Sequence, residues 1–208
     1  MMNQDRWQLP DGVDELLPQQ ASAAEIMRRA ALDLFASWGY AQIEPPLIEF
    51  TDSLLIGMGD DIALQSFRLT DQVSGRPMAV RADISAQAAR IDAHSMQAKD
   101  VNRLCYAGAV LHARPSPLAA SRCPIMVGTE LFGEPSVDGD IEVASLMLDS
   151  LRAVESALND QSCSSRQLQR LTIDLGHVAI YRALTTRITQ CNPNCSDDSL
   201  QQLFDAVQ

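Results

Sequence analysis

The sequence predicts an α+β fold in which a mostly antiparallel sheet is flanked by helices. Three observations support this: a helical apolar period over residues 19–38, two strand-like runs over 102–111 and 125–132, and a second helical period over 138–158. With 208 residues, of which 46% are hydrophobic, the chain can bury one substantial core. We therefore expect residues 1–208 to form one domain.

The N-terminal part is expected to begin with a mobile tail over residues 1–6 and a loop up to Pro18. The helix that follows places Met27, Ala31 and Phe35, among others, on one apolar face, and Gly39 ends it. This helix is expected to cover the sheet.

Short elements are predicted next. They are a strand over 40–43, an extended edge at Pro45-Pro46, a short helix over 52–57 capped by Thr51 or Asp52, an acidic turn over 57–61, and a hairpin of 67–70 with 78–81. Asp83 is placed to cap a helix over residues 84–91. The same carboxylate could equally contact a ligand, and one residue could do both.

The strands over 102–111 and 125–132 should form an antiparallel ribbon joined by a long loop, with Arg114 and Arg122 flanking that loop. Those arginines are either solvated loop charges or contacts for an anion or for acids of a partner subunit. Ser136 can cap the helix over 138–158. The remaining elements expected are a buried strand over 171–175, a helix over 177–188 that His177 begins, and a last helix over 199–207.

Charge and cysteine content exclude several classes of function. The net charge is −11 and Lys99 is the one lysine, so nucleic acid is not expected as the main partner. Five cysteines at uneven spacing do not indicate a disulfide framework, and Cys191 and Cys195 lack the second pair that zinc would need. No apolar run approaches the ~20 residues of a membrane span. We expect a cytoplasmic protein with no metal and no cofactor.

Several segments resemble the catalytic core of histidyl-tRNA synthetase, a class II aminoacyl-tRNA synthetase. They are Leu9–Pro18, Trp38–Glu49, Val80–Ser85, the ribbon from Tyr106, Met126–Gly133 and Leu171–His177. The resemblance covers nearly the whole chain and implies a class II synthetase-like antiparallel sheet, of which this chain would hold the front half. It also implies a dimer.

The chain departs from the synthetase pattern at the nucleotide end of the site. His112 stands nearest to the place of an arginine that stabilises charge during adenylation, and Met126 replaces a glutamine. The amino-acid end keeps its chemistry, with Asp83 and Ser85 where the synthetase has Glu and Thr. Arg81–Arg90 and Tyr106–Pro115 fit more closely the paralogous family of ATP phosphoribosyltransferase regulatory subunits.

This second resemblance implies a non-catalytic subunit that activates the short-form catalytic subunit in the first step of histidine biosynthesis and conveys feedback inhibition by histidine. The residues that would face L-histidine are Asp83, Ser85, Tyr106 and Glu130, and anion or partner contacts would come from Arg81, His112, Arg114 and Arg122. The assembly would be a homodimer within a hetero-oligomer. The alternatives are a divergent synthetase core that still adenylates histidine, and a scaffold that binds no small molecule.

Overall fold

A computed structural model describes residues 7–56, 60–97, 99–115, 121–161, 171–174, 176 and 178–191. It contains two compact units, Met1–Gln167 and Leu168–Gln208. The first unit holds the elements α1 to α5 and all the strands, and the second holds α6 (Val178–Cys191). Within the described residues, no helix is both long enough and apolar enough to cross a membrane.

The predictions for the second unit have mixed outcomes. The helix expected over 177–188 is confirmed as α6. The strand expected over 171–175 is wrong, because residues 171–174 adopt no regular structure and are exposed. An apolar run forms a strand only when a neighbouring strand pairs with it. The expected tail 1–6, His177 and the helix 199–207 lie outside the described residues.

The first sheet consists of β1 (Ala41–Gln42), β5 (Asn102–Ala109) and β6 (Ile125–Phe132) in the order β1-β5-β6. β5 and β6 are antiparallel, with a register that runs from Asn102 opposite Phe132 to Ala109 opposite Ile125. The predicted ribbon is therefore confirmed. β1 is parallel to β5, which adds one parallel pair to the sheet.

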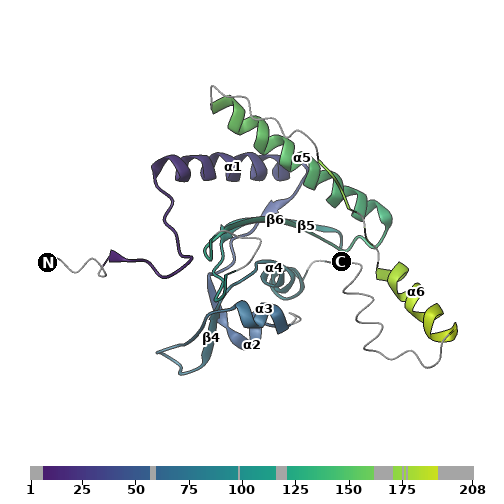
Figure 1. Ribbon diagram of the computed structural model, residues 1–208, viewed down its shortest axis with the longest axis horizontal. Coiled ribbons are helices and arrows are strands. Elements are labelled where there is room, and N and C mark those ends of the chain that lie inside the picture. Colours follow the sequence, from purple (N-terminus) through teal and green to yellow (C-terminus); the bar gives the residue numbers. More distant parts are fainter. Residues whose placement is uncertain are drawn as a thin grey trace. The chain divides into compact units, whose positions relative to one another are not determined.

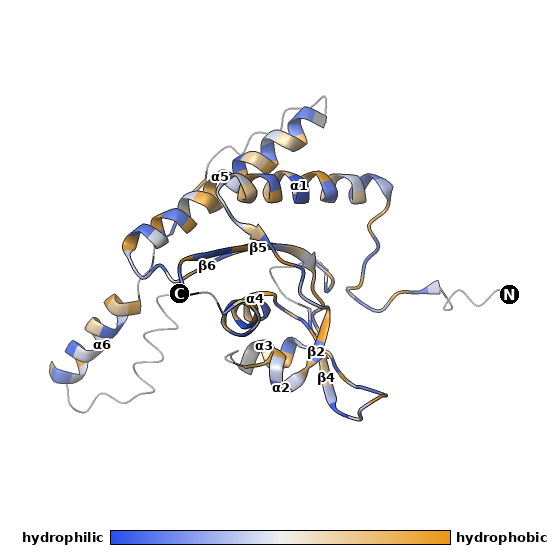
Figure 2. Cartoon of the chain, turned by 180° about the vertical axis from the view of Figure 1, so that it is seen from behind, coloured by the Kyte–Doolittle hydropathy of each residue, from blue (hydrophilic) through white to orange (hydrophobic). Residues whose placement is uncertain are grey.

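Two long helices cover one face of this sheet, α1 (Pro18–Ser37) and α5 (Val137–Gln161) (Figure 1). α1 begins where Pro18 fixes the backbone and the Leu17 N–H donates to Gln20 Oε1 at 3.2 Å. In Figure 2 both helices alternate hydrophilic and hydrophobic segments along their length. The apolar sides meet in a core of Ala31, Phe35, Tyr40, Cys105 and Leu146. Both predicted helices are confirmed.

A second, smaller sheet has the order β2-β4-β3, formed by β2 (Ile48–Phe50), β4 (Pro77–Val80) and β3 (Arg68–Thr70). The predicted hairpin is β3–β4, and the predicted short helix is α2 (Thr51–Leu54). Its predicted cap at Thr51 or Asp52 is wrong, because Phe50 is the N-cap and both residues lie inside the helix. The acidic turn expected over 57–61 is wrong at Asp60 and Asp61, because both belong to α3 (Asp60–Gln65). Residues 57–59 lie outside the described part of the chain.

The short helix α4 (Ser85–Arg90) follows β4 and continues as a π-helical turn, η2 (Ile91–Met96). It lies against the face of the first sheet opposite to α1 and α5 (Figure 1). Its apolar side packs in a second core of Ile84, Ala88, Tyr106 and Val110. This packing brings the residues before and at the start of α4 to the face of the ribbon that carries Tyr106.

Arg81 connects the two sheets from the end of β4. Its side chain is buried, with Nη1 donating to Pro45 O at 2.7 Å and Nε to Ala109 O at 2.9 Å. A Cβ at Gly108 would collide with Arg81 Nη2 and lie 3.5 Å from Ile84 Cδ1. The guanidinium thus fits over β5 only because residue 108 has no side chain.

A polar network joins α5 to the sheet. Arg103 donates from Nε and Nη2 to the two carboxylate oxygens of Glu142, each at 2.7 Å, and the Tyr40 hydroxyl donates to Glu142 Oε1 at 2.9 Å. Burial, together with the hydrogen bond to Glu142, raises the pKa of Tyr40 from 10.0 to about 12. The fold therefore favours the neutral phenol.

We predict that the protein loses stability between pH 10 and about pH 12. A raised phenol pKa means that the folded state holds its proton more tightly than the unfolded state, so stability is fully present below pH 10 and falls as pH rises through about 12. Tyr40→Phe should cost roughly 1 kcal/mol at pH 7, through the lost hydrogen bond. The difference in the free energy of unfolding between Tyr40→Phe and wild type should become smaller above pH 10. Urea unfolding at a series of pH values measures this, and a constant gap would contradict it.

We also predict that Gly108→Ala destabilises the first unit by about 1–3 kcal/mol, because the added methyl group overpacks the Arg81 site. Gly176→Ala is the matched control, since a Cβ there meets no atom of the described residues within 4 Å. Its effect should stay within about 0.5 kcal/mol. Equal effects of the two substitutions in urea unfolding would show that Arg81 does not need the space.

Candidate ligand site on the ribbon

Asp83, Ser85, Tyr106 and Glu130 come together on the α4 side of the first sheet, and we call them the carboxylate–hydroxyl cluster. Tyr106 lies opposite Gly128 in the ribbon and Glu130 lies opposite Leu104, so Tyr106 and Glu130 share one face. Ser85 is the first residue of α4, and Asp83 precedes it in the turn after β4. Elements from three parts of the sequence therefore build the cluster.

Hydrogen bonds connect the four residues in a chain. The Ser85 N–H donates to Asp83 Oδ1 at 2.6 Å, Ser85 Oγ lies 3.2 Å from the Tyr106 hydroxyl oxygen, and that hydroxyl donates to Glu130 Oε1 at 3.2 Å. A phenol has one proton to donate, so Tyr106 donates to Glu130 and accepts from Ser85. The prediction that Asp83 is the N-cap of this helix is wrong, because Ile84 takes that position and makes no side-chain cap. The Asp83 carboxylate nevertheless accepts from the N–H of Ser85, the first residue of α4.

The cluster is acidic, because two of its four members have carboxyl side chains. Tyr106 is 4% exposed, and burial is the main cause that raises its pKa to about 12, with Glu130 and Asp83 adding to the rise. Among the described residues, no Arg or Lys makes an ion pair with Asp83 or Glu130. Two carboxylates next to hydroxyl groups can accept hydrogen bonds from N–H donors. An ammonium or imidazole ligand fits this chemistry.

Gly128 gives Tyr106 its place in the cluster. A Cβ at residue 128 would lie 2.5 Å from the Tyr106 hydroxyl oxygen and 2.7 Å from Cζ. The ring thus lies across the β6 backbone and reaches Glu130 diagonally. Sequence reasoning missed this role of Gly128, although a glycine within a strand signals a close approach of this kind.

A small pocket adjoins the buried side of Tyr106. Arg81 and Tyr106 are the predicted site residues that line it, together with Ile43, Glu44, Pro45, Ile84, Ala107 and Gly108. Burial lowers the pKa of the Arg81 guanidinium, and the charge of Glu44 works in the opposite direction. Because Arg81 donates to two backbone carbonyls, it acts as a structural link in this geometry.

His112 lies at the start of the ribbon loop, and its ring contacts the residue that precedes Asp83. Its Nε2 is 3.0 Å from Ala82 O, so in the neutral ring this nitrogen carries the proton and Nδ1 is the acceptor. Nδ1 is buried without a hydrogen-bond partner among the described residues. A ring in this state cannot make the two-pronged contact to an anion that an arginine makes.

The two arginines of the ribbon loop differ in their contacts. Arg114 is exposed. Arg122 donates from Nε to His112 O, from Nη1 to Asp11 O and from Nη2 to Ala113 O, at 2.9, 3.0 and 2.9 Å. Arg122 therefore fastens the N-terminal segment to the loop, and the guanidinium also stacks on Phe67 at 5.1 Å from the ring centroid.

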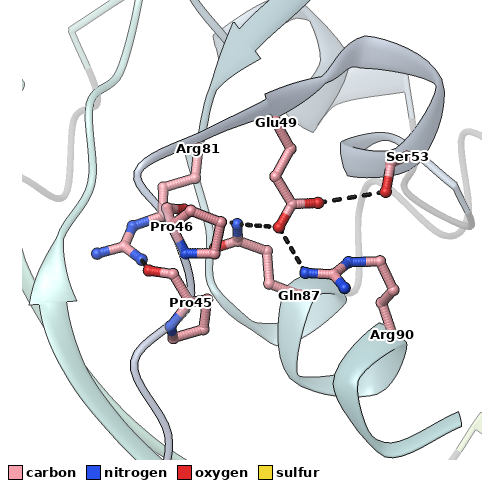
Figure 3. Close-up of polar contacts among 7 residues, drawn as sticks. All are labelled: Pro45, Pro46, Glu49, Ser53, Arg81, Gln87 and Arg90. Atoms are coloured by element: carbon pink, nitrogen blue, oxygen red, sulfur yellow. Dashed lines mark hydrogen bonds and ion pairs between the residues drawn. The ribbon is translucent and has the colours of Figure 1, made fainter. Parts of the chain in front are cut away.

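Sequence reasoning also missed a cluster around Glu49 (Figure 3). Glu49 accepts hydrogen bonds from Ser53, Gln87 and Arg90 at 3.2, 2.8 and 2.6 Å. A lone Glu before a short helix carries no signal in the sequence that would identify these partners.

No group of His, Cys, Asp and Glu side chains in the described ranges could hold a metal ion.

Solved structures share the fold. The chain superposes on an ATP phosphoribosyltransferase regulatory subunit/histidyl-tRNA synthetase from Bacillus halodurans with a TM-score of 0.64 and 26% identity, over 74% of this chain and 40% of that one. It also superposes on apo histidyl-tRNA synthetase of S. aureus with a TM-score of 0.57 and 20% identity, over 70% of this chain and 34% of that one. The α+β, class II synthetase-like fold predicted from the sequence is confirmed.

Curated relatives are more similar in sequence. The chain is 53% identical over 184 residues to a protein of Saccharophagus degradans, which covers 88% of this chain and 44% of the relative. It is 47% identical over 208 residues to a protein of Pseudomonas aeruginosa, which covers all of this chain and 48% of the relative. Both relatives are named ATP phosphoribosyltransferase regulatory subunit. The chain spans about half the length of these relatives.

A sequence-family model matches almost the whole chain. The model described as histidyl-tRNA synthetase matches residues 12–208, which include every residue of the carboxylate–hydroxyl cluster. The resemblance seen in the sequence is thus confirmed. The chain belongs to the histidyl-tRNA synthetase family.

Proposed function

We propose that this chain acts as a regulatory, non-catalytic subunit of ATP phosphoribosyltransferase. It would bind and activate a short-form catalytic subunit in the cytoplasm, in the first step of histidine biosynthesis, and would convey feedback inhibition by histidine. The names of the relatives at 47–53% identity support the assignment to the regulatory subunit. The active assembly would contain a homodimer of this chain within a hetero-oligomer, as the family resemblance implies.

The contrast between the two ends of the site carries this proposal. The carboxylate–hydroxyl cluster offers acceptors for the amine and imidazole N–H groups of L-histidine. The guanidinium groups of Arg81 and Arg122 donate to backbone carbonyls, so they are not directed at a bound phosphate or carboxylate. Adenylation needs fixed positive groups aimed at the charge that develops on phosphate and carboxylate. The geometry favours recognition of an amino acid over its activation.

Regulation requires that histidine and this chain distinguish two states of the catalytic subunit, since a ligand shifts an equilibrium only through a difference in affinity. Histidine bound at the cluster would contact α4 and both ribbon strands at once. A change in how these elements pack would then be the signal passed to the partner subunit.

The first prediction from this proposal concerns activity. Adding this chain to a short-form catalytic subunit should raise the rate of phosphoribosyl-ATP formation, and titrated histidine should lower the rate again. Asp83→Asn should keep the activation and weaken the histidine response, with Asp33→Asn on the exposed side of α1 as the matched control. No activation at any ratio of the two proteins would contradict the regulatory assignment. Histidine-dependent exchange of pyrophosphate into ATP would instead favour a synthetase activity.

The second prediction concerns binding of L-histidine by calorimetric titration. Asp83→Asn keeps an acceptor for the Ser85 N–H but removes the charge, whereas Asp83→Ala removes both. Both variants should bind histidine at least about tenfold more weakly, the effect of losing one charge-assisted hydrogen bond. Only Asp83→Ala should also lower the melting temperature, because it removes the acceptor for the Ser85 N–H.

Glu130→Gln tests the other carboxylate and should weaken binding by a similar factor. If all three variants and wild type bound histidine equally, the cluster would not be the histidine site. If wild type bound none, the third reading, a scaffold without a small-molecule ligand, would replace this one.

A further inference from the structure

Glu49 sits on β2 of the second sheet, yet its side chain reaches α4. The carboxylate is largely buried, with 10% of the side chain exposed. Oε1 accepts from Gln87 Nε2 at 2.8 Å and from Arg90 Nη2 at 2.6 Å, and Oε2 accepts from Ser53 Oγ at 3.2 Å. Figure 3 shows these side chains converging on Glu49.

The two partners on α4 lie three residues apart, at positions 87 and 90. Residues at this spacing share one side of a helix, so contacts to both fix the rotation of the helix about its axis. Gln87 makes the link firmer, because its Nε2 is also 2.8 Å from Pro46 O. The main chain just before β2 and the carboxylate on β2 thus hold the same side of α4.

Ser85 is the first residue of α4, only two residues before Gln87. A helix of six residues is too short to be stable alone, so outside contacts determine its position. The 3.2 Å approach of Ser85 Oγ to the Tyr106 hydroxyl therefore depends on how Glu49 holds the helix. None of these three hydrogen bonds of Glu49 involves a member of the carboxylate–hydroxyl cluster itself.

We propose that Glu49 is a positioning residue for the carboxylate–hydroxyl cluster. By holding Gln87 and Arg90 it sets the rotation of α4, and so places Ser85 against Tyr106 in the arrangement that binds the amine of histidine. The part of this inference that concerns histidine rests on the proposed function. The part that concerns Ser85 and Tyr106 does not.

Glu49→Gln tests the inference, because it keeps the shape of the side chain and removes the charge that holds Arg90. Protein with ¹³C at the tyrosine Cζ gives one NMR resonance for each of the three tyrosines, which Tyr→Phe variants assign. In folded Glu49→Gln the Tyr106 resonance should shift while that of Tyr40 stays. The Kd for histidine should rise at least about tenfold, as for loss of a charge-assisted hydrogen bond.

Glu25→Gln is the matched control, because Glu25 makes exposed ion pairs with Arg28 and Arg29 within α1. It should leave both tyrosine resonances and histidine binding unchanged. If Glu49→Gln does not fold, Arg90→Lys serves as the milder test, since it keeps the positive charge and removes the guanidinium that contacts Glu49. The same changes are then expected.

A folded variant with an unchanged Tyr106 resonance and unchanged histidine affinity would overturn the inference, as would a shifted resonance with unchanged affinity. Absence of histidine binding in wild type would instead remove the proposed ligand. The Tyr106 resonance would still decide whether Glu49 positions Ser85.

Discussion

The first unit depends on how the buried charge of Arg81 is compensated. Arg81 is 6% exposed, and its buried guanidinium would be costly without partners; here the backbone carbonyls of Pro45 and Ala109 accept from it. Pro45 lies in the segment after β1 and Ala109 is the last residue of β5, so the contact ties the second sheet to the first. The turn that leads from β4 into α4 starts at this anchored residue. The placement of Asp83 and Ser85 therefore depends on where Arg81 is held, together with the contacts that Glu49 makes with α4.

The elements that could be predicted from the sequence are those with a strong periodic pattern. The spacing of Ala31 and Phe35 determines the buried side of α1, and the ribbon follows from two strand-like runs around a loop rich in turn residues. The run 171–174 shows the limit of such patterns, because apolar character alone did not supply a pairing partner. α3 was missed since Asp60 and Asp61 follow glycines and suggest a turn, although acidic residues also suit the first turn of a helix.

The candidate site was predictable in its residue types and not in its geometry. The resemblance to a family identified Asp83, Ser85, Tyr106 and Glu130, and the structure brings all four together. A glycine within a strand signals a close approach, but the sequence did not indicate that the Tyr106 ring makes it at Gly128. Nor did it indicate that Arg122 would donate to backbone carbonyls. Contacts of this kind join residues up to 111 positions apart, and they depend on tertiary packing that a local pattern does not encode.

The contacts of Arg122 have a consequence for how the N-terminal segment behaves. The Arg122 N–H donates to Gly12 O at 2.6 Å while its side chain donates to Asp11 O and to the loop carbonyls of His112 and Ala113. The N-terminal segment around residue 12 is largely exposed, so it has few other contacts to keep it in place. The N-terminal segment and the described part of the ribbon loop are thus coupled through one residue, Arg122. A molecule that binds at His112 or Ala113 would therefore act on a segment more than a hundred residues away in the sequence.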